Sequence, residues 1–141
     1  MKYDAFTIGQ VFESDSLIVT KADIMGFAEK FDPQYMHLDE EKAAEGIYNG
    51  IIASGIHTLG VSFKLWVELG VYGEDIVAGT GMDRMRFLRP VYPGDELRVV
   101  VEVINKKRVK KDAGIVTVLL STYNAGNEKV FKGELSALIK R

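Results

Sequence analysis

Cysteine is absent from this chain of 141 residues, and proline occurs only 3 times. Without cysteine the chain can form no disulfide framework, no thiolate metal site and no catalytic thiol. Its 2 histidines are too few to hold a structural zinc ion by themselves. A strong excess of one charge is also missing: the formal net charge of -2 indicates neither nucleic acid nor an anionic membrane as a partner. We therefore expect no metal site and no nucleic-acid partner.

A signal peptide and a membrane span are not apparent either. The N-terminal residues MKYDAFTIGQ lack the basic start and the apolar segment of a signal peptide. The most apolar stretch, 51–69, contains Lys64 and Glu68 and is too polar to span a membrane. These absences predict a cytoplasmic protein. Since 47% of the residues are hydrophobic, the chain can bury a sizeable core, and we expect a single domain over residues 1–141.

The hydrophobic pattern changes from strand to helix along the first half of the chain. Residues 11–19 are extended in character and predict a short edge strand. Residues 21–30 predict a short amphipathic helix with Thr20 as its N-cap, and residues 39–45 predict a second short helix. From 51 to 69, apolar residues recur at spacings of three and four, which predicts a long helix.

After Gly70 the apolar period becomes 2, which predicts four long strands joined by turns as an antiparallel meander, over 76–88, 96–105, 114–124 and 129–140. Strongly twisted strands of this kind can wrap around a long apolar helix. The pattern predicts an α+β hot-dog fold, with one antiparallel sheet wrapped around one long central helix. An open edge of such a sheet can be removed by pairing with a second copy, so we expect a homodimer or a higher even oligomer.

The residues that carry chemistry gather between positions 31 and 60. Asp32 and His37 lie in a segment that Pro33 keeps out of helix, because the residue before a proline disfavours helical geometry. We expect a loop that aims both side chains at one point. The long helix then opens with the small residues Ala53, Ser54 and Gly55. Free N–H groups at a helix start suit a developing negative charge, so the sequence predicts a proton carrier beside an anion hole.

Several short motifs lie in and after this region: DPQ followed by HLDEE, then GIIASG with HT, and later LRPV with PGD. Together they are similar to those of the MaoC-like hydratases and dehydratases, a hot-dog family related to the (R)-specific enoyl-CoA hydratases. The resemblance covers about residues 20–103. It implies that Asp32 and His37 carry the water chemistry. It also implies that the N–H of Gly55 binds the thioester oxygen and that the Ser54 hydroxyl orients Asp32 or the water.

The resemblance implies an enoyl-CoA hydratase or 3-hydroxyacyl-thioester dehydratase. The reaction would convert a trans-2-enoyl thioester reversibly to the (R)-3-hydroxyacyl thioester. Coenzyme A or acyl carrier protein would belong to the substrate, and no other cofactor is expected. Asp32 would take a proton from water and return it to the α-carbon, while His37 holds the water. Two other functions stay open, a hot-dog acyl-CoA thioesterase and a non-catalytic subunit that binds acyl thioesters.

Burial in an apolar cleft is expected to raise the pKa of Asp32 toward neutrality. His57, on the long helix, is interpreted as a packed residue, with a direct role in the cleft as the alternative. Met36 and Tyr35 are candidates for lining the acyl tunnel, although core packing is the simpler interpretation of Met36.

The basic residues of the second half allow two interpretations. Arg84 and Arg86 are alternate residues of a strand and share a face, so together with Arg89 they are candidates for binding coenzyme A phosphates. The basic run 106–111 is interpreted as a solvated hairpin tip, with phosphate binding as the alternative.

Overall fold

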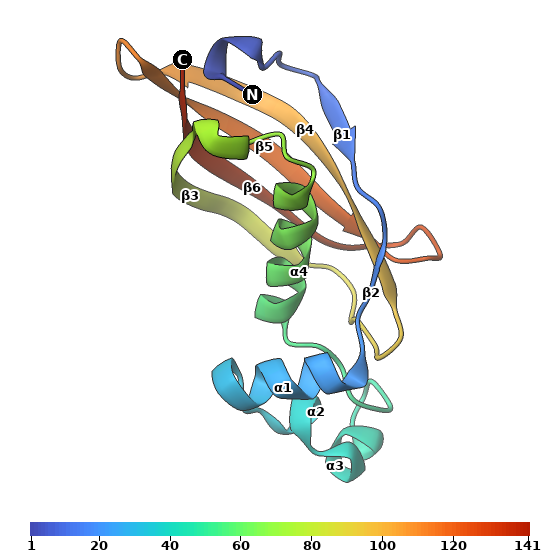
Figure 1. Ribbon diagram of the computed structural model, residues 1–141. Coiled ribbons are helices and arrows are strands. Elements are labelled where there is room, and N and C mark those ends of the chain that lie inside the picture. The colour runs from blue at the N-terminus through green and yellow to red at the C-terminus, as the bar shows by residue number, and fades with distance from the viewer.

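The computed structural model describes residues 1–141, and it shows a curved antiparallel sheet packed against one long helix (Figure 1). The helix α4 (Gly55–Glu68) packs along the inner face of a six-stranded sheet. This arrangement confirms the expected hot-dog fold. Neither α4 nor any other helix has the length and apolar character that crossing a bilayer requires.

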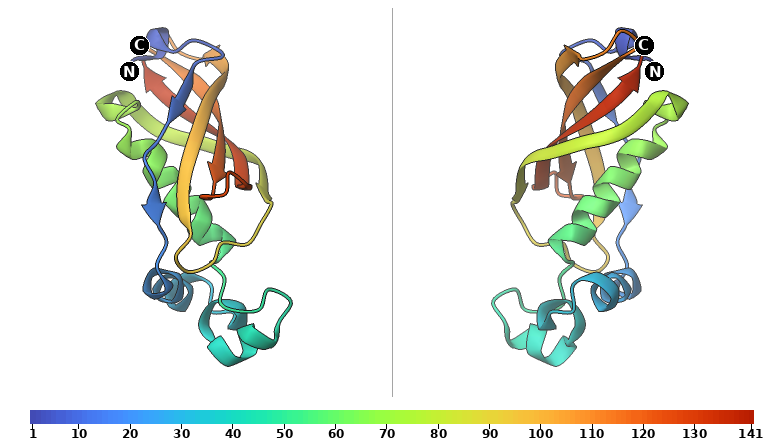
Figure 2. Two further views of the ribbon diagram at one scale, coloured as in Figure 1. Left: turned by 90° about the vertical axis from the view of Figure 1, so that its right-hand side faces the viewer. Right: turned by 90° about the vertical axis from the view of Figure 1, so that its left-hand side faces the viewer.

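Three strands form the expected meander, namely β4 (Glu96–Arg108), β5 (Ala113–Tyr123) and β6 (Lys129–Lys140). The fourth, β3 (Ile76–Phe87), pairs with β6 and not with β4, so the strand order is β1-β4-β5-β6-β3. The prediction of a four-strand meander is therefore wrong for β3. The link 88–95 crosses the end of the curved sheet to reach β4 on the far side (Figure 2). Twist and curvature bring the two sides close enough for this short link.

The edge strand expected over 11–19 forms as two short pieces. These are β1 (Val11–Glu13) and β2 (Leu17–Ile18), and both pair with β4. Ser14 begins the break between them: its N–H donates to the carbonyl of Val99 at 3.0 Å, and its Oγ accepts from the N–H of Val99 at 2.9 Å. The hydroxyl takes the place of a backbone carbonyl, so β4 keeps its partner where the regular strand pairing ends.

Three short helices form a lobe beyond one end of the sheet (Figure 1). They are α1 (Lys21–Phe31), α2 (Tyr35–Leu38) and α3 (Glu40–Glu45). Thr20 caps α1 as expected, since its Oγ1 accepts from the N–H of Asp23 at 3.1 Å. The helix α2 differs from the expected open loop, because a proline restricts the residue before it and leaves the residues after it free to close a helical turn.

The long helix starts at Gly55, later than the expected position 51. Residues 51–54 are buried but not helical, because their backbone groups pair with other segments. The N–H of Ile52 donates to the carbonyl of Met36 at 3.1 Å, and that of Ala53 to the carbonyl of Val91 at 2.8 Å. Apolar spacing alone could not reveal this boundary, since both the extended segment and the helix bury apolar side chains.

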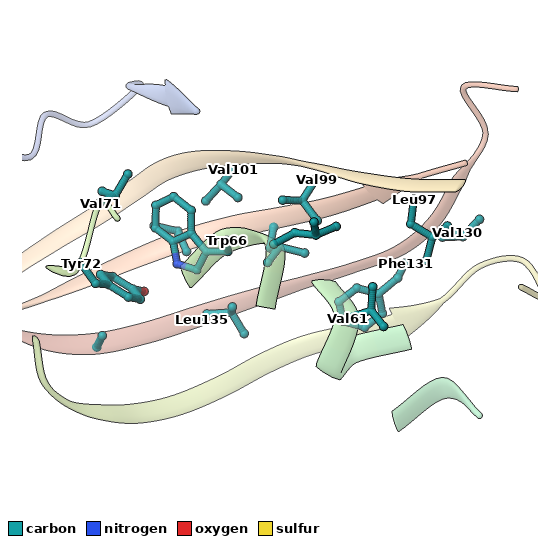
Figure 3. Packing of buried hydrophobic residues seen from close by; sticks show 14 of the residues in the cluster. Val61, Trp66, Val71, Tyr72, Leu97, Val99, Val101, Val130, Phe131 and Leu135 are labelled. Atoms are coloured by element: carbon teal, nitrogen blue, oxygen red, sulfur yellow. The ribbon is translucent and has the colours of Figure 1, made fainter. Parts of the chain in front are cut away.

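The hydrophobic core lies between α4 and the sheet (Figure 3). Trp66 of α4 is fully buried and packs against Phe12 and Tyr72, with ring centroids 5.6 Å and 5.1 Å away. Inward-facing residues of the sheet complete this layer, among them Leu97, Val99, Val101 and Leu135. Burial of such large side chains contributes most of the favourable free energy of folding.

A buried polar bridge sets the position of α4 against the sheet. The Oγ of Ser62 lies 2.6 Å from the Oγ1 of Thr122 on β5, and it donates to the carbonyl of Thr58 at 2.7 Å. Both hydroxyls are fully buried. Because a buried hydroxyl without a partner costs about 1–3 kcal/mol, the helix is held at the position where this bridge forms.

Candidate active site

Asp32 and His37 meet where the helical lobe joins α4. Asp32 is the C-cap of α1, and its own N–H donates to the carbonyl of Ala28 at 2.9 Å. His37 lies in α2, with its Nε2 3.2 Å from the Oδ2 of Asp32. The structure therefore brings together the two side chains that the sequence analysis paired.

The ring of His37 links the backbone to Asp32. It is buried, and Nδ1 lies 2.6 Å from the carbonyl oxygen of Ile52. A carbonyl oxygen can only accept, so Nδ1 is the donor in this hydrogen bond. The Nε2 faces the carboxylate of Asp32, which accepts a hydrogen bond from it. The two contacts fix the orientation of the ring.

The carboxylate of Asp32 is held by neighbouring donors. The buried Ser54 hydroxyl donates to it, and the Nε2 of Gln34 donates to its Oδ1 at 2.7 Å. Hydrogen bonds from Ser54 and then Gln34 lower the pKa of Asp32 below its usual value, and they outweigh the opposing effect of burial. The expectation of a raised pKa is therefore wrong, and Asp32 is ionised at neutral pH.

Gln34 is a site residue that the sequence analysis missed. Its side chain contacts Asp32 because Pro33, between the two, lies in a non-helical turn that lets a side chain two positions on reach back. The sequence signal for this contact was the two-residue spacing of Asp32 and Gln34 across Pro33, because the amide of Gln34 can donate to a nearby carboxylate.

The start of α4 leaves backbone donors free, among them the N–H of Gly55, which lines the same cavity as Asp32. Ser54 caps the helix, with its Oγ accepting from the N–H of Ile56 at 3.3 Å and its carbonyl accepting from the N–H of Thr58 at 3.0 Å. The N–H of Gly55 has no partner within the chain. A free N–H at the positive end of a helix is suited to hold an oxyanion.

These groups line one cavity of about 560 Å³, a size typical of small-molecule sites. The cavity lies between the lobe, the start of α4 and the link after β3, and its lining is mostly apolar. It contains most of the expected site residues and several that were not expected: Asp32, Gln34, Tyr35, Met36, His37, Ile52, Ser54, Gly55, Thr58, Phe87, Arg89 and Val91. The chain has no cluster of three or more His, Asp or Glu side chains that could hold a metal ion.

Arg84 and Arg86 do not line this cavity, and their contact with coenzyme A phosphates stays a prediction. A bulge in β3 gives Arg84 a φ of 51°, and its Nη1 lies 3.2 Å from Glu134 on β6. The Nη1 of Arg86 donates to the carbonyl of Met85 at 3.0 Å. Arg89 lines the cavity instead, with its side chain 57% exposed and its Nη1 2.9 Å from Glu128.

The basic run 106–111 lies around the turn between β4 and β5, at the opposite end of the sheet from the lobe (Figure 1). Lys106 lies over the ring of Tyr3, with its Nζ 4.4 Å from the ring centroid, and donates to the carbonyl of Phe6 at 2.7 Å. The strand β4 extends to Arg108, further than the predicted end at 105, because its pairing with β5 continues that far. Within one chain this run is remote from the cavity.

His57 packs between α1 and α4 and does not line the cavity. Its ring stacks on Phe27 with centroids 4.8 Å apart and planes 7° from parallel. Its buried Nδ1 has no hydrogen-bond partner. Burial lowers the pKa of His57, and the charge of Asp23 only partly offsets this. The interpretation of His57 as a packed residue is confirmed.

Comparisons with known proteins agree with this geometry. The family model described as "MaoC like domain" matches residues 4–124. The uncharacterized protein YdeM of Bacillus subtilis (strain 168) is 64% identical over 141 residues, which is 100% of both chains. The structure of a MaoC-like dehydratase from Rhodospirillum rubrum is 33% identical, with a TM-score of 0.92 over 100% of this chain and 97% of that chain. The R-hydratase PhaJ1 from Pseudomonas aeruginosa is 27% identical, with a TM-score of 0.76 over 98% and 84%.

The half-buried ring of His57 predicts that stability depends on pH. Its folded-state pKa lies below the ordinary value of 6.5, so the unfolded chain binds this proton more readily. The contribution of His57 to the free energy of unfolding is therefore fully present above pH 6.5. It is lost as the pH falls through the folded-state pKa of this ring. Urea unfolding between about pH 7.5 and 5 should show this loss in the wild type. The variant His57→Phe keeps the stacked ring but cannot titrate, so its stability should change less; equal slopes would contradict the assignment.

Proposed function

The chain belongs to the MaoC-like domain family, and from this membership we propose that it is an enoyl-CoA hydratase. The reaction is the reversible addition of water to a trans-2-enoyl thioester, which gives the (R)-3-hydroxyacyl thioester. The family and its solved relatives indicate hydratase or dehydratase chemistry on thioesters in general. One observation carries the specific proposal: the Asp32–His37 pair lies in the same cavity as the free N–H of Gly55.

Asp32 and His37 hold and activate the water in this proposal. The ionised carboxylate accepts one O–H of the water and the Nε2 of His37 holds the water oxygen, which leaves a lone pair of that oxygen directed at the substrate. As the oxygen bonds to the β-carbon, Asp32 takes a proton from the water. The electron pair of the C=C bond moves toward the carbonyl, and the thioester becomes an enolate.

Gly55 stabilises the enolate oxygen through its N–H at the start of α4. A donor of this kind contributes about 3 kcal/mol to lowering the barrier, because it points at the charge before that charge develops. Asp32 then returns its proton to the α-carbon, which completes the addition of water. Each step uses groups of the chain itself, so we propose no cofactor apart from the thiol carrier of the substrate.

The donors around Asp32 support its role as the base. Ser54 and Gln34 keep the carboxylate ionised at neutral pH, so it is ready to accept a proton from water whenever a substrate is bound. Both donors also restrict its orientation toward His37. Tyr35 and Met36 line the same cavity and are the proposed contacts of the acyl group.

The catalytic pair predicts a specific pattern of mutant activities. Asp32→Asn should lower hydration of crotonyl-CoA at least about a hundredfold, because it removes the base while keeping the size of the side chain. His37→Gln should also be severely impaired, and the double variant should be little worse than the worse single variant. His57→Gln serves as the control and should retain most activity. Loss of activity in His57→Gln, with Asp32→Asn intact, would exclude the proposed pair.

The same assay separates hydration from the alternative functions. Loss of enoyl absorbance and release of free thiol are followed in parallel with crotonyl-CoA. Loss of absorbance without free thiol supports the hydratase. Release of thiol would instead indicate a thioesterase, and binding without either change would indicate a non-catalytic acyl-thioester-binding subunit.

The thiol carrier is proposed to be coenzyme A or acyl carrier protein, with Arg89 as a phosphate ligand. A guanidinium can bind phosphate through two parallel N–H donors. Arg89→Gln should raise KM for crotonyl-CoA more than it changes kcat, because this contact is kept equally in the ground and transition states. KM for crotonyl-pantetheine, which lacks the nucleotide, should not change. Arg84→Gln, outside the cavity, tests the other candidate for this contact, and a rise in KM for Arg84→Gln alone would remove the assignment of Arg89.

We also propose that the chain is a cytoplasmic homodimer. The edge strand β3 leaves backbone groups unpaired and exposes Val77, and α4 exposes Ile56 and Val67. Pairing of β3 with a second copy would cover this edge and its apolar side chains. Sedimentation should therefore give a dimer or an even multiple of it. A compact, active monomer at about micromolar concentration would contradict the proposal.

A further inference from the structure

Phe87, the last residue of β3, lies directly against the start of α4. Its ring is backed by Phe131 of β6, with centroids 5.4 Å apart. Phe131 is fully buried, whereas Phe87 is 56% exposed and lines the cavity. The ring therefore has a rigid support on one side and is free to meet a bound molecule on the other.

The contact between Phe87 and Gly55 is close enough to require glycine. A Cβ built on Gly55 would lie 2.8 Å from Cε1 and 2.9 Å from both Cδ1 and Cζ of the Phe87 ring. Gly55 does not have a positive φ, so backbone conformation does not explain the residue. Glycine is also a poor helix former, and its presence at the first position of α4 is accounted for by the approach of this ring.

The ring borders the residue that carries the free N–H. An aromatic side chain against the helix start would keep water away from this donor and lower the local dielectric constant. In such surroundings a hydrogen bond to a developing negative charge is stronger than the same bond in water. The ring would act on the Gly55 N–H and not on Asp32 or His37, because those two side chains are held by other contacts.

We propose that Phe87 is a positioning residue that shields the Gly55 N–H and holds the substrate carbonyl against it. This inference rests on the proposed function and deepens it, since it assigns the wall of the oxyanion site. The substrate's flat enoyl thioester lies between the ring and the Asp32–His37 pair. Phe87 acts through Gly55 and takes no part in proton transfer.

Steady-state kinetics with crotonyl-CoA form the first part of the test. Phe87→Leu keeps an apolar side chain but removes the ring, and kcat should fall about tenfold, less than the loss expected when an oxyanion donor is removed outright. KM should change little, because the shielding matters most when the oxygen becomes negative. The control Met82→Leu changes another exposed apolar residue of β3 outside the cavity, and it should leave both constants unchanged. A rise in KM with unchanged kcat would overturn the proposal.

The second part does not require hydration. Butyryl-CoA has no double bond to hydrate, and the infrared stretch of its thioester carbonyl reports the strength of the hydrogen bond that it accepts. Binding to the wild type should shift this stretch to lower frequency, and Phe87→Leu should reduce the shift while Met82→Leu preserves it. An equal shift in wild type and Phe87→Leu, or no shift in the wild type, would overturn the proposal. A shift that depends on Phe87 in a protein that does not hydrate crotonyl-CoA would support the proposal and refute the hydratase function.

Discussion

The candidate site depends on the pairing of Ile52 with α2. The N–H of Ile52 donates to the carbonyl of Met36, and its own carbonyl accepts from the Nδ1 of His37 at 2.6 Å. These two bonds join the helical lobe to the extended segment that leads into α4. They hold the imidazole in one orientation, and they bring the lobe's Asp32 beside Ser54. Without this pairing, the side chains of Asp32 and His37 would have no fixed position relative to the start of α4.

Ser54 couples the helix start to the carboxylate. Its Oγ accepts from the N–H of Ile56, which leaves its hydroxyl proton to donate to Asp32. One side chain thus caps α4 and lowers the pKa of the acidic residue. The positive end of the helix favours the same ionised state and also the oxyanion proposed at Gly55. The two charges of the proposed mechanism are therefore stabilised by a single structural element.

The rest of the fold keeps that element rigid. Trp66 anchors the second half of α4 in the core, and the bridge between Ser62 and Thr122 anchors its middle to β5. Against the start of α4, Phe87 ends a strand that pairs with β6. A site assembled from such supported elements needs little reorganisation when a substrate binds, which is the condition for effective electrostatic stabilisation.

The sequence by itself determined the order of helices and strands, the hot-dog fold and the placing of Asp32, His37, Ser54 and Gly55 in one region, because periodicity and turn residues act over short distances. Tertiary structure alone decided the pairing of β3 with β6 and the late start of α4, because both depend on backbone hydrogen bonds between distant segments. It also lowered the pKa of Asp32 and put Arg89, but neither Arg84 nor Arg86, in the lining of the cavity. A pKa and a place in a cavity are set by groups that meet only after folding, so no local pattern encodes them.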